Sequence, residues 1–168
     1  DYPIEACYTA LMYFYDQLRG TEQMMLDFAA DEELAKYILN QIQTFSTAHM
    51  KKILDIVGDR AEYGQVTDDL GSQHGLLISP AMLHKYVEEH YIEQATILKS
   101  YGLKVFHHSD GAMTQALPWL MDIIGIDILN PLQWHLPGWD LKKIKADYGD
   151  RLCFHGGVDN QFALPFGT

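Results

Sequence analysis

The chain has 168 residues, 48% of them hydrophobic and 21% charged, which suits one globular core and is too little for two. Lys and Arg together number 12 against 23 Asp and Glu, so the formal net charge is -11 and nucleic acid or an anionic membrane surface would repel the chain. Prolines and charged residues interrupt the longest apolar stretch, residues 116–134, which excludes a transmembrane helix.

Cysteine usage indicates a reducing compartment. Cys7 and Cys153 are too few for a disulfide-framed secreted domain, and the first residues show no signal-peptide pattern. No Pro/Gly/Ser-rich linker interrupts the chain. We therefore predict a cytoplasmic protein organised as a single domain over residues 1–168, without nucleic-acid or membrane partners.

Apolar periodicity predicts helices over the first third of the chain, residues 4–57. Apolar residues recur there at spacings of three or four, as at Leu34 and Ile38. Gly20 and Gly58 are the expected helix ends.

Beyond residue 61, short strand-like runs alternate with helical segments. The predicted strands are residues 62–67, 104–108, 126–129 and 152–155. The predicted helices between them are residues 79–102, 113–124 and 141–148, with Ser79 and Asp140 as N-caps and Pro118 weakening the first turns of the second.

Strands separated by helical crossovers predict an α/β fold with a parallel sheet, either a (β/α)8 TIM barrel or an open doubly wound sheet. Neither a G-x-G-x-x-G run nor a Walker A run is present, and this favours the barrel. In both folds, the chemistry lies at the carboxyl ends of the strands.

Polar residues follow each predicted strand at this edge. His108 and Asp110 are two residues apart at a strand end, so their side chains point the same way and could share one cation. The alternative is that His108 bonds to a neighbouring strand and Asp110 caps the following turn. The adjacent Asp68 and Asp69 alternate, so we expect only one of them to face the pocket, or else a solvated loop cap.

Four segments in this order resemble the uroporphyrinogen decarboxylase superfamily, which contains the tetrapyrrole decarboxylase and related cobalamin-linked methyltransferases. They are TDDLGSQ at residues 67–73, FHHSDG at 106–111, GIDILNPLQ at 125–133 and FHGGVD at 154–159. The resemblance implies a (β/α)8 barrel. Since a complete barrel needs about 250 residues, this chain is expected to form an incomplete one, its central and later part.

The methyltransferase branch binds zinc through a His-x-Cys pair at a strand end and a later Cys, and the zinc activates a thiol acceptor. Here His108 matches the pair and Asp110 stands where that branch has Cys. An oxygen ligand is harder than a thiolate, so the resemblance implies either weaker zinc binding, another cation or no metal.

The decarboxylase branch uses an aspartate and several arginines that clamp the substrate's carboxylates. This chain has Arg19, Arg60 and Arg151, none of them in a strand-end motif, whereas those motifs are rich in aspartate. A polyanionic tetrapyrrole would be repelled there.

The methyltransferase interpretation is therefore favoured, with a small-molecule methyl donor or acceptor, a partner corrinoid protein that carries cobalamin, and a homodimer as the expected assembly. A tetrapyrrole decarboxylase and a non-catalytic corrinoid- or ligand-binding barrel are the alternatives. The predicted catalytic residues are Asp69, His108 and Asp110, with His108 and Asp110 as metal ligands. The predicted substrate-binding residues are Asp68, Gln73, Asn130, Gln133, His155, Asp159 and Gln161.

Overall fold

Five parallel strands form one sheet in a computed structural model that describes residues 2–167. The strands are β1 (Glu5–Ala10), β2 (Tyr63–Thr67), β3 (Lys104–His108), β4 (Ile128–Asn130) and β5 (Cys153–Phe154). Their spatial order is β1-β2-β3-β4-β5, so each strand pairs with the next one in sequence. A doubly wound sheet would reverse its order at a switch point, so the winding is that of a partial TIM barrel.

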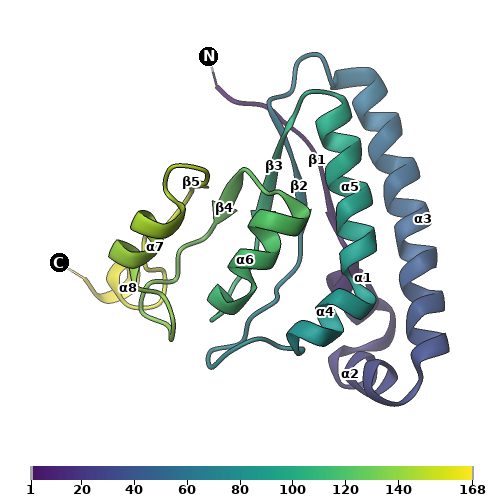
Figure 1. The fold of residues 1–168 in the computed structure, drawn as a ribbon, viewed down its shortest axis with the longest axis horizontal. Coiled ribbons are helices and arrows are strands. Elements are labelled where there is room, and N and C mark those ends of the chain that lie inside the picture. The colour runs from purple at the N-terminus through teal and green to yellow at the C-terminus, as the bar shows by residue number, and fades with distance from the viewer. Residues whose placement is uncertain (1, 168) are drawn as a thin grey trace.

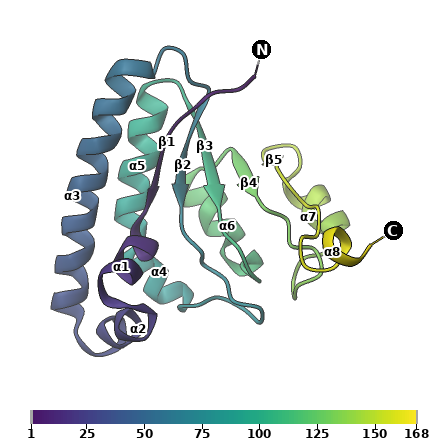
Figure 2. The same ribbon diagram turned by 180° about the vertical axis from the view of Figure 1, so that it is seen from behind.

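Helices connect successive strands and cover the sheet (Figure 1). The first crossover contains α1 (Leu11–Arg19), α2 (Thr21–Ala30) and α3 (Glu32–Val57), and the second α4 (Pro80–Tyr86) and α5 (Glu88–Ser100). The later elements are η1 (Thr114–Ala116), α6 (Leu117–Trp119), η2 (Leu120–Ile124), α7 (Leu141–Tyr148) and α8 (Ala163–Phe166). In Figures 1 and 2, α3 and α5 run side by side, and α1, α2 and α4 gather near one end of the sheet.

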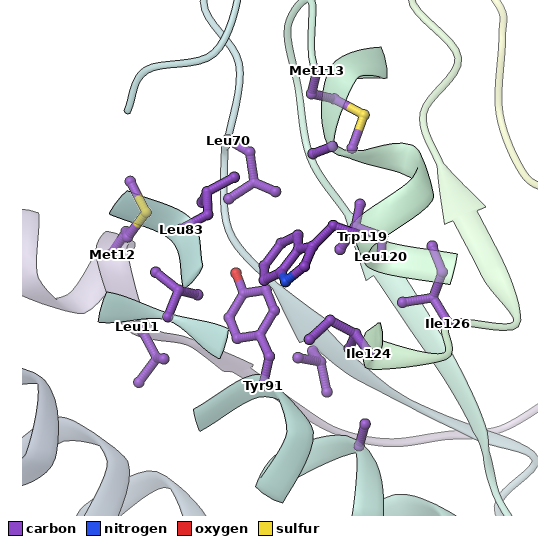
Figure 3. Packing of buried hydrophobic residues seen from close by; sticks show 14 of the residues in the cluster. Leu11, Met12, Leu70, Leu83, Tyr91, Met113, Trp119, Leu120, Ile124 and Ile126 are labelled. Atoms are coloured by element: carbon purple, nitrogen blue, oxygen red, sulfur yellow. The ribbon is translucent and has the colours of Figure 1, made fainter. Parts of the chain in front are cut away.

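The core lies between the sheet and these helices. Tyr91 on α5 is fully buried there, and its ring stacks on Trp119 with centroids 5.8 Å apart (Figure 3). Leu11 and Leu83 pack in the same cluster. Burial of each such side chain contributes about 1.5–3 kcal/mol, which anchors the helices that follow the strand ends. Within residues 2–167, no helix has the length and apolar character to cross a bilayer.

The helix predicted over residues 4–10 is wrong, because Glu5–Ala10 forms β1 at the edge of the sheet. Pairing with β2 places Thr9 opposite Val66 and Ala10 opposite Thr67. Only Cys7, Thr9 and Ala10 of this strand are buried, so buried and exposed residues do not alternate regularly along it. Without a regular alternation, the segment was predicted as the first part of the helix that follows it. Tertiary pairing overrides the local pattern here.

Other boundaries differ by a few residues. The helix predicted from residue 79 to 102 is divided at Val87, which separates α4 from α5. The helix predicted at 113–124 is divided into a 3₁₀ turn, a short α segment and a π segment. It contains Pro118, which has no backbone N–H and so cannot donate a helical hydrogen bond. The strand expected at 126–129 is β4, which is shifted to Ile128–Asn130, and the strand expected at 152–155 is β5, which is shortened to Cys153–Phe154. The predictions for β3 and α7 are confirmed in full.

A candidate metal centre at the strand ends

Three potential metal ligands converge where β2 and β3 end. Asp69 follows β2, His108 is the last residue of β3, and Asp110 lies two residues further on. One ligand atom from each lies within 4.8 Å of those of the other two. Asp69 Oδ1 is 3.7 Å from His108 Nε2 and accepts a 2.9 Å hydrogen bond from the Asp110 backbone N–H. The structure thus assembles one imidazole and two carboxylates, which we call the strand-end triad.

Asn130, at the end of β4, determines which ring nitrogen of His108 faces the triad. Its Nδ2 donates to the backbone carbonyl of His155 at 3.0 Å, and this orients its Oδ1 toward His108. That oxygen lies 2.7 Å from His108 Nδ1, and because an amide oxygen only accepts, Nδ1 must carry the proton. In the neutral ring, Nε2 then presents its lone pair toward Asp69.

Gln133, in the loop after β4, holds Asp110 in position. Its Nε2 donates to Asp110 Oδ1 at 3.1 Å, and its Oε1 accepts from the Gly111 backbone N–H at 2.6 Å. Partial burial raises the pKa of Asp110, and the nearby Asp69 charge raises it further. Gln133 therefore holds the Asp110 carboxylate in position, and within residues 2–167 no Lys or Arg forms a salt bridge with it.

Asp68 and Asp69 diverge, as their alternation along the chain predicts. Asp68 is fully buried behind the sheet end and accepts from the backbone N–H groups of Leu11 and Tyr13, at 2.9 and 2.8 Å, and from Tyr91 Oη at 2.7 Å. Burial raises the pKa of Asp68 to about 6, although these three donors oppose the effect. Asp68 therefore ties the start of α1 to β2 and α5 and does not face the triad.

The two loops that carry the carboxylates are in direct backbone contact. Gly111 has φ +90°, and a Cβ there would lie 2.3 Å from the Gly71 carbonyl carbon. The Ala112 N–H donates to the Ser72 carbonyl at 2.7 Å in the same contact. Only glycine combines this left-handed backbone with so close an approach, so the loops hold Asp69 and Asp110 at a fixed separation.

The remaining predicted site residues occupy different places. His155 joins the network because Asn130 Nδ2 also lies 2.9 Å from its Nδ1. Asp159 lines a small cavity with Asp110 and Gln133, but its Oδ1 accepts from the backbone N–H groups that precede α8. Gln73 and Gln161 are exposed and make no side-chain hydrogen bond in the described part of the chain.

Two features of the site were missed by sequence reasoning. Asp69 was predicted to be catalytic but not to join His108 and Asp110 as a ligand, and the parallel register of β2 with β3 is what brings it there. A cavity of about 190 Å³ beside Asp69, lined also by Met12 and Met24, was not foreseen. Its walls come from α1 and α2, whose positions follow from β1, the strand that was predicted as helix.

The donor set fits a divalent cation. Three protein ligands with remaining open positions are typical of catalytic metal centres, and a second residue that hydrogen-bonds the ligating imidazole is typical as well. His108 with Asn130 meets the second condition. The set contains no thiolate, so it suits harder cations better than a His-x-Cys pair does.

Comparison with known proteins gives one family. The family model described as uroporphyrinogen decarboxylase (URO-D) matches residues 4–168. No curated protein and no solved structure gives a significant match.

Proposed function

Because the chain belongs to the uroporphyrinogen decarboxylase family, whose members are enzymes, we propose that it catalyses methyl transfer between a small molecule and a corrinoid protein, at a metal ion held by the strand-end triad. The partner protein would present its cobalamin to the carboxyl ends of the strands, the edge at which barrel enzymes place their chemistry.

One observation carries the proposal: three acceptor groups converge, and within residues 2–167 the only side-chain donor to them is Gln133 Nε2, which bonds one oxygen of Asp110. The tautomer imposed by Asn130 directs the Nε2 lone pair of His108 toward Asp69, and Asp110 completes the group. Such an arrangement is repulsive unless a proton or a metal cation lies between the groups. A divalent cation would satisfy all three acceptors at once.

When bound, a divalent ion would supply Lewis acidity toward the oxygen, nitrogen or sulfur atom from which the methyl group leaves or to which it is transferred. Zinc is the metal expected by family resemblance, and the imidazole–dicarboxylate set also suits harder cations. The chain's own residues would keep the ligands in place: Asn130 fixes the His108 tautomer, and Gln133 orients Asp110. Neither residue needs to move during transfer.

The charge at the site distinguishes this proposal from tetrapyrrole decarboxylation. A substrate with many carboxylates needs cationic side chains, but the three arginines pair elsewhere. Arg19 pairs with Asp27, Arg60 with Asp59 and Arg151 with Asp122, and none of these pairs includes a residue of the triad. Within residues 2–167, no Lys or Arg lines the cavity beside Asp69. The local charge supports a substrate that is not an anion.

The test combines metal analysis with a corrinoid assay. The purified protein is dialysed against zinc, cobalt or manganese, and its bound metal is counted. Methyl transfer is then followed by corrinoid absorbance in both directions, as demethylation of methylcobalamin by a small thiol and as methylation of cob(I)alamin by a small methyl donor. We expect about one ion per chain, and loss of both the ion and the activity in His108→Ala and Asp110→Ala. His74→Ala, an exposed histidine in the neighbouring loop, is the matched control.

Three outcomes would contradict the proposal. If both variants keep wild-type methyl transfer, the triad has no part in it. If the protein instead decarboxylates uroporphyrinogen, the alternative within the family replaces methyl transfer. Stoichiometric binding of cobalamin without turnover would indicate a carrier.

A further inference from the structure

The cavity beside Asp69 carries information about the substrate. It has a volume of about 190 Å³ and lies between α1, α2 and the loops that follow β2. Met12, Tyr13, Met24 and Leu77 supply most of its wall. Because Asp69 belongs both to this wall and to the strand-end triad, a molecule in the cavity lies next to the proposed metal.

Asp16 gives the cavity a negative charge with no cation beside it. Its carboxylate accepts hydrogen bonds from Thr21 Oγ1 and, at 3.1 Å, from Gln17 Nε2, both of them neutral donors. The basic residue of the same helix, Arg19, is held by two hydrogen bonds of 3.0 and 3.1 Å to Asp27. The Asp16 charge is therefore hydrogen-bonded but not neutralised within the described residues.

Apart from Asp16, Thr21 and Asp69, the wall is apolar and polarisable. The half-exposed Tyr13 ring offers a π face, and Met12 and Met24 offer thioether sulfurs. Proteins bind alkylated cations where a carboxylate lies next to an aromatic ring and soft apolar groups. The carboxylate and the ring face attract the positive charge, and the apolar wall packs against the alkyl groups.

From this arrangement we propose that the cavity binds a small methylated onium cation, a quaternary ammonium or a sulfonium without carboxylate groups, as the methyl donor. The proposal rests on the proposed function of the triad and names its substrate class. A bound metal does not oppose such a ligand, because the charges of Asp69 and Asp110 offset the charge of the ion.

The transfer balances without an added proton or oxidant. The cobalt of a cob(I)alamin held by the corrinoid partner supplies an electron pair to the methyl carbon, and a cobalt–carbon bond forms. The carbon–nitrogen or carbon–sulfur bond breaks, and its electron pair remains on the heteroatom. A quaternary nitrogen has no lone pair before this step, so a metal held by the triad would interact only with the amine that forms, whereas a sulfonium sulfur has a lone pair throughout. The products are methylcobalamin and a tertiary amine or thioether that is uncharged when the bond breaks. A thioether stays uncharged and is no longer attracted by Asp16, whereas a tertiary amine takes up a proton from water at neutral pH and leaves as the ammonium ion.

The test uses three ligands of nearly equal shape and different charge: choline, its neutral isostere 3,3-dimethylbutan-1-ol, and the anion 3,3-dimethylbutanoate. Binding is measured by calorimetry with metal-free and zinc-loaded protein. We expect choline to bind at least about tenfold more tightly than the neutral alcohol, and the anion not to bind. Asp16→Asn should remove this preference and leave the affinity for the alcohol unchanged.

Two further variants separate charge from folding. Glu22→Gln removes one exposed acid from α2 that does not line the cavity, and it should keep the preference. Tyr13→Leu keeps Asp16 and should weaken the binding of choline more than the binding of the alcohol. Circular dichroism of each variant identifies any that fails to fold, and Asp16→Ser, which also removes the charge and should also remove the preference, then serves in place of Asp16→Asn.

The inference is overturned if the alcohol or the anion binds as tightly as choline, if none of the three binds, or if Asp16→Asn retains the preference. Metal counting in the same samples separates this failure from that of the triad. If the protein binds zinc but does not prefer choline, only the substrate class is refuted. If the protein prefers choline but binds no metal, the metal site at the triad is refuted and the cation site is supported.

Discussion

The carboxamide of Asn130 controls the chemistry of His108 although it would not touch the metal. It is fixed by the His155 carbonyl at 3.0 Å and accepts from His108 Nδ1 at 2.7 Å. In Asn130→Ala, either ring nitrogen can carry the proton, so part of the population presents an N–H to the metal position. Loss of such a partner reduces metal affinity about 10- to 100-fold in comparable sites.

Competition titration against a chromophoric chelator measures this effect. Asn130→Asp is the informative companion: a carboxylate still accepts from Nδ1 but loses the donor to the His155 carbonyl, so this variant should retain more affinity than Asn130→Ala and less than the wild type. Asn40→Ala, at an exposed position on α3, controls for the substitution itself. Equal metal affinities for Asn130→Ala and the wild type would show that the tautomer is fixed by something other than Asn130.

The second prediction at the residue scale concerns Asp68 and the pH dependence of stability. Burial raises the pKa of Asp68 from 3.8 to about 6, so the folded protein holds this proton more tightly than the unfolded chain. Its contribution to stability is therefore full below pH 3.8 and is lost as the pH rises through 6. Between about pH 4.5 and about pH 7.5, this group alone should lower the free energy of unfolding by about 2 kcal/mol.

Urea unfolding of metal-free protein at these two pH values, with wild type and Asp68→Asn, isolates the effect. Asn cannot titrate, so the variant should lack this loss. Asp68→Asn should also be less stable than the wild type at low pH. The amide N–H₂ of the new side chain would face the backbone N–H of Leu11 or of Tyr13, and two donors that face each other cost about 1–3 kcal/mol. Parallel pH dependences of the two proteins would refute the raised pKa.

At the scale of elements, the contact between the loops after β2 and β3 determines whether the triad forms. Gly111→Ala introduces a Cβ 2.3 Å from the Gly71 carbonyl carbon, in addition to the strain of φ +90°. Gly102→Ala has nearly the same backbone, φ +77°, but its Cβ would have no neighbour within 4 Å. We expect Gly102→Ala to cost about 1–2 kcal/mol of stability, and Gly111→Ala clearly more.

Only Gly111→Ala should also weaken metal binding, because it separates the loops that carry Asp69 and Asp110. Chemical denaturation and metal titration of both variants provide the measurements. If the two substitutions have the same effect on stability and on metal affinity, the loop contact has no special role.

Elements were predicted best where local signals and tertiary contacts agree. β3 is a strand with three buried residues in a row, and α7 begins at Asp140, whose side chain accepts from the Lys143 backbone N–H. β1 was missed because its strand conformation depends on pairing with β2, some 50 residues later, which no local pattern encodes. The cavity walls formed by α1 and α2 were unforeseen for the same reason.

At the scale of the whole molecule, the fold class was predictable because the alternation of strands and helices and the absence of a phosphate loop leave few topologies. This topology also predicted which edge of the sheet carries the polar residues. It did not predict that Asp69 converges with His108, since that convergence depends on the register of β2 against β3. Topology thus predicts where a site lies, and register decides which side chains meet.

That dependence makes metal binding a property of the whole fold. The ligands of the triad come from two strand ends separated by the α4–α5 crossover, so the unfolded chain has no preformed site. A metal ion at about 100 times its dissociation constant should raise the free energy of unfolding by about 2.7 kcal/mol, and the melting temperature by about 5–10 °C for a chain of this size. Asp69→Asn should lose most of this increase, while Asp150→Asn, at an exposed position after α7, should keep it. Differential scanning calorimetry with and without zinc makes the comparison, and an equal increase in Asp69→Asn would place the metal elsewhere on the protein.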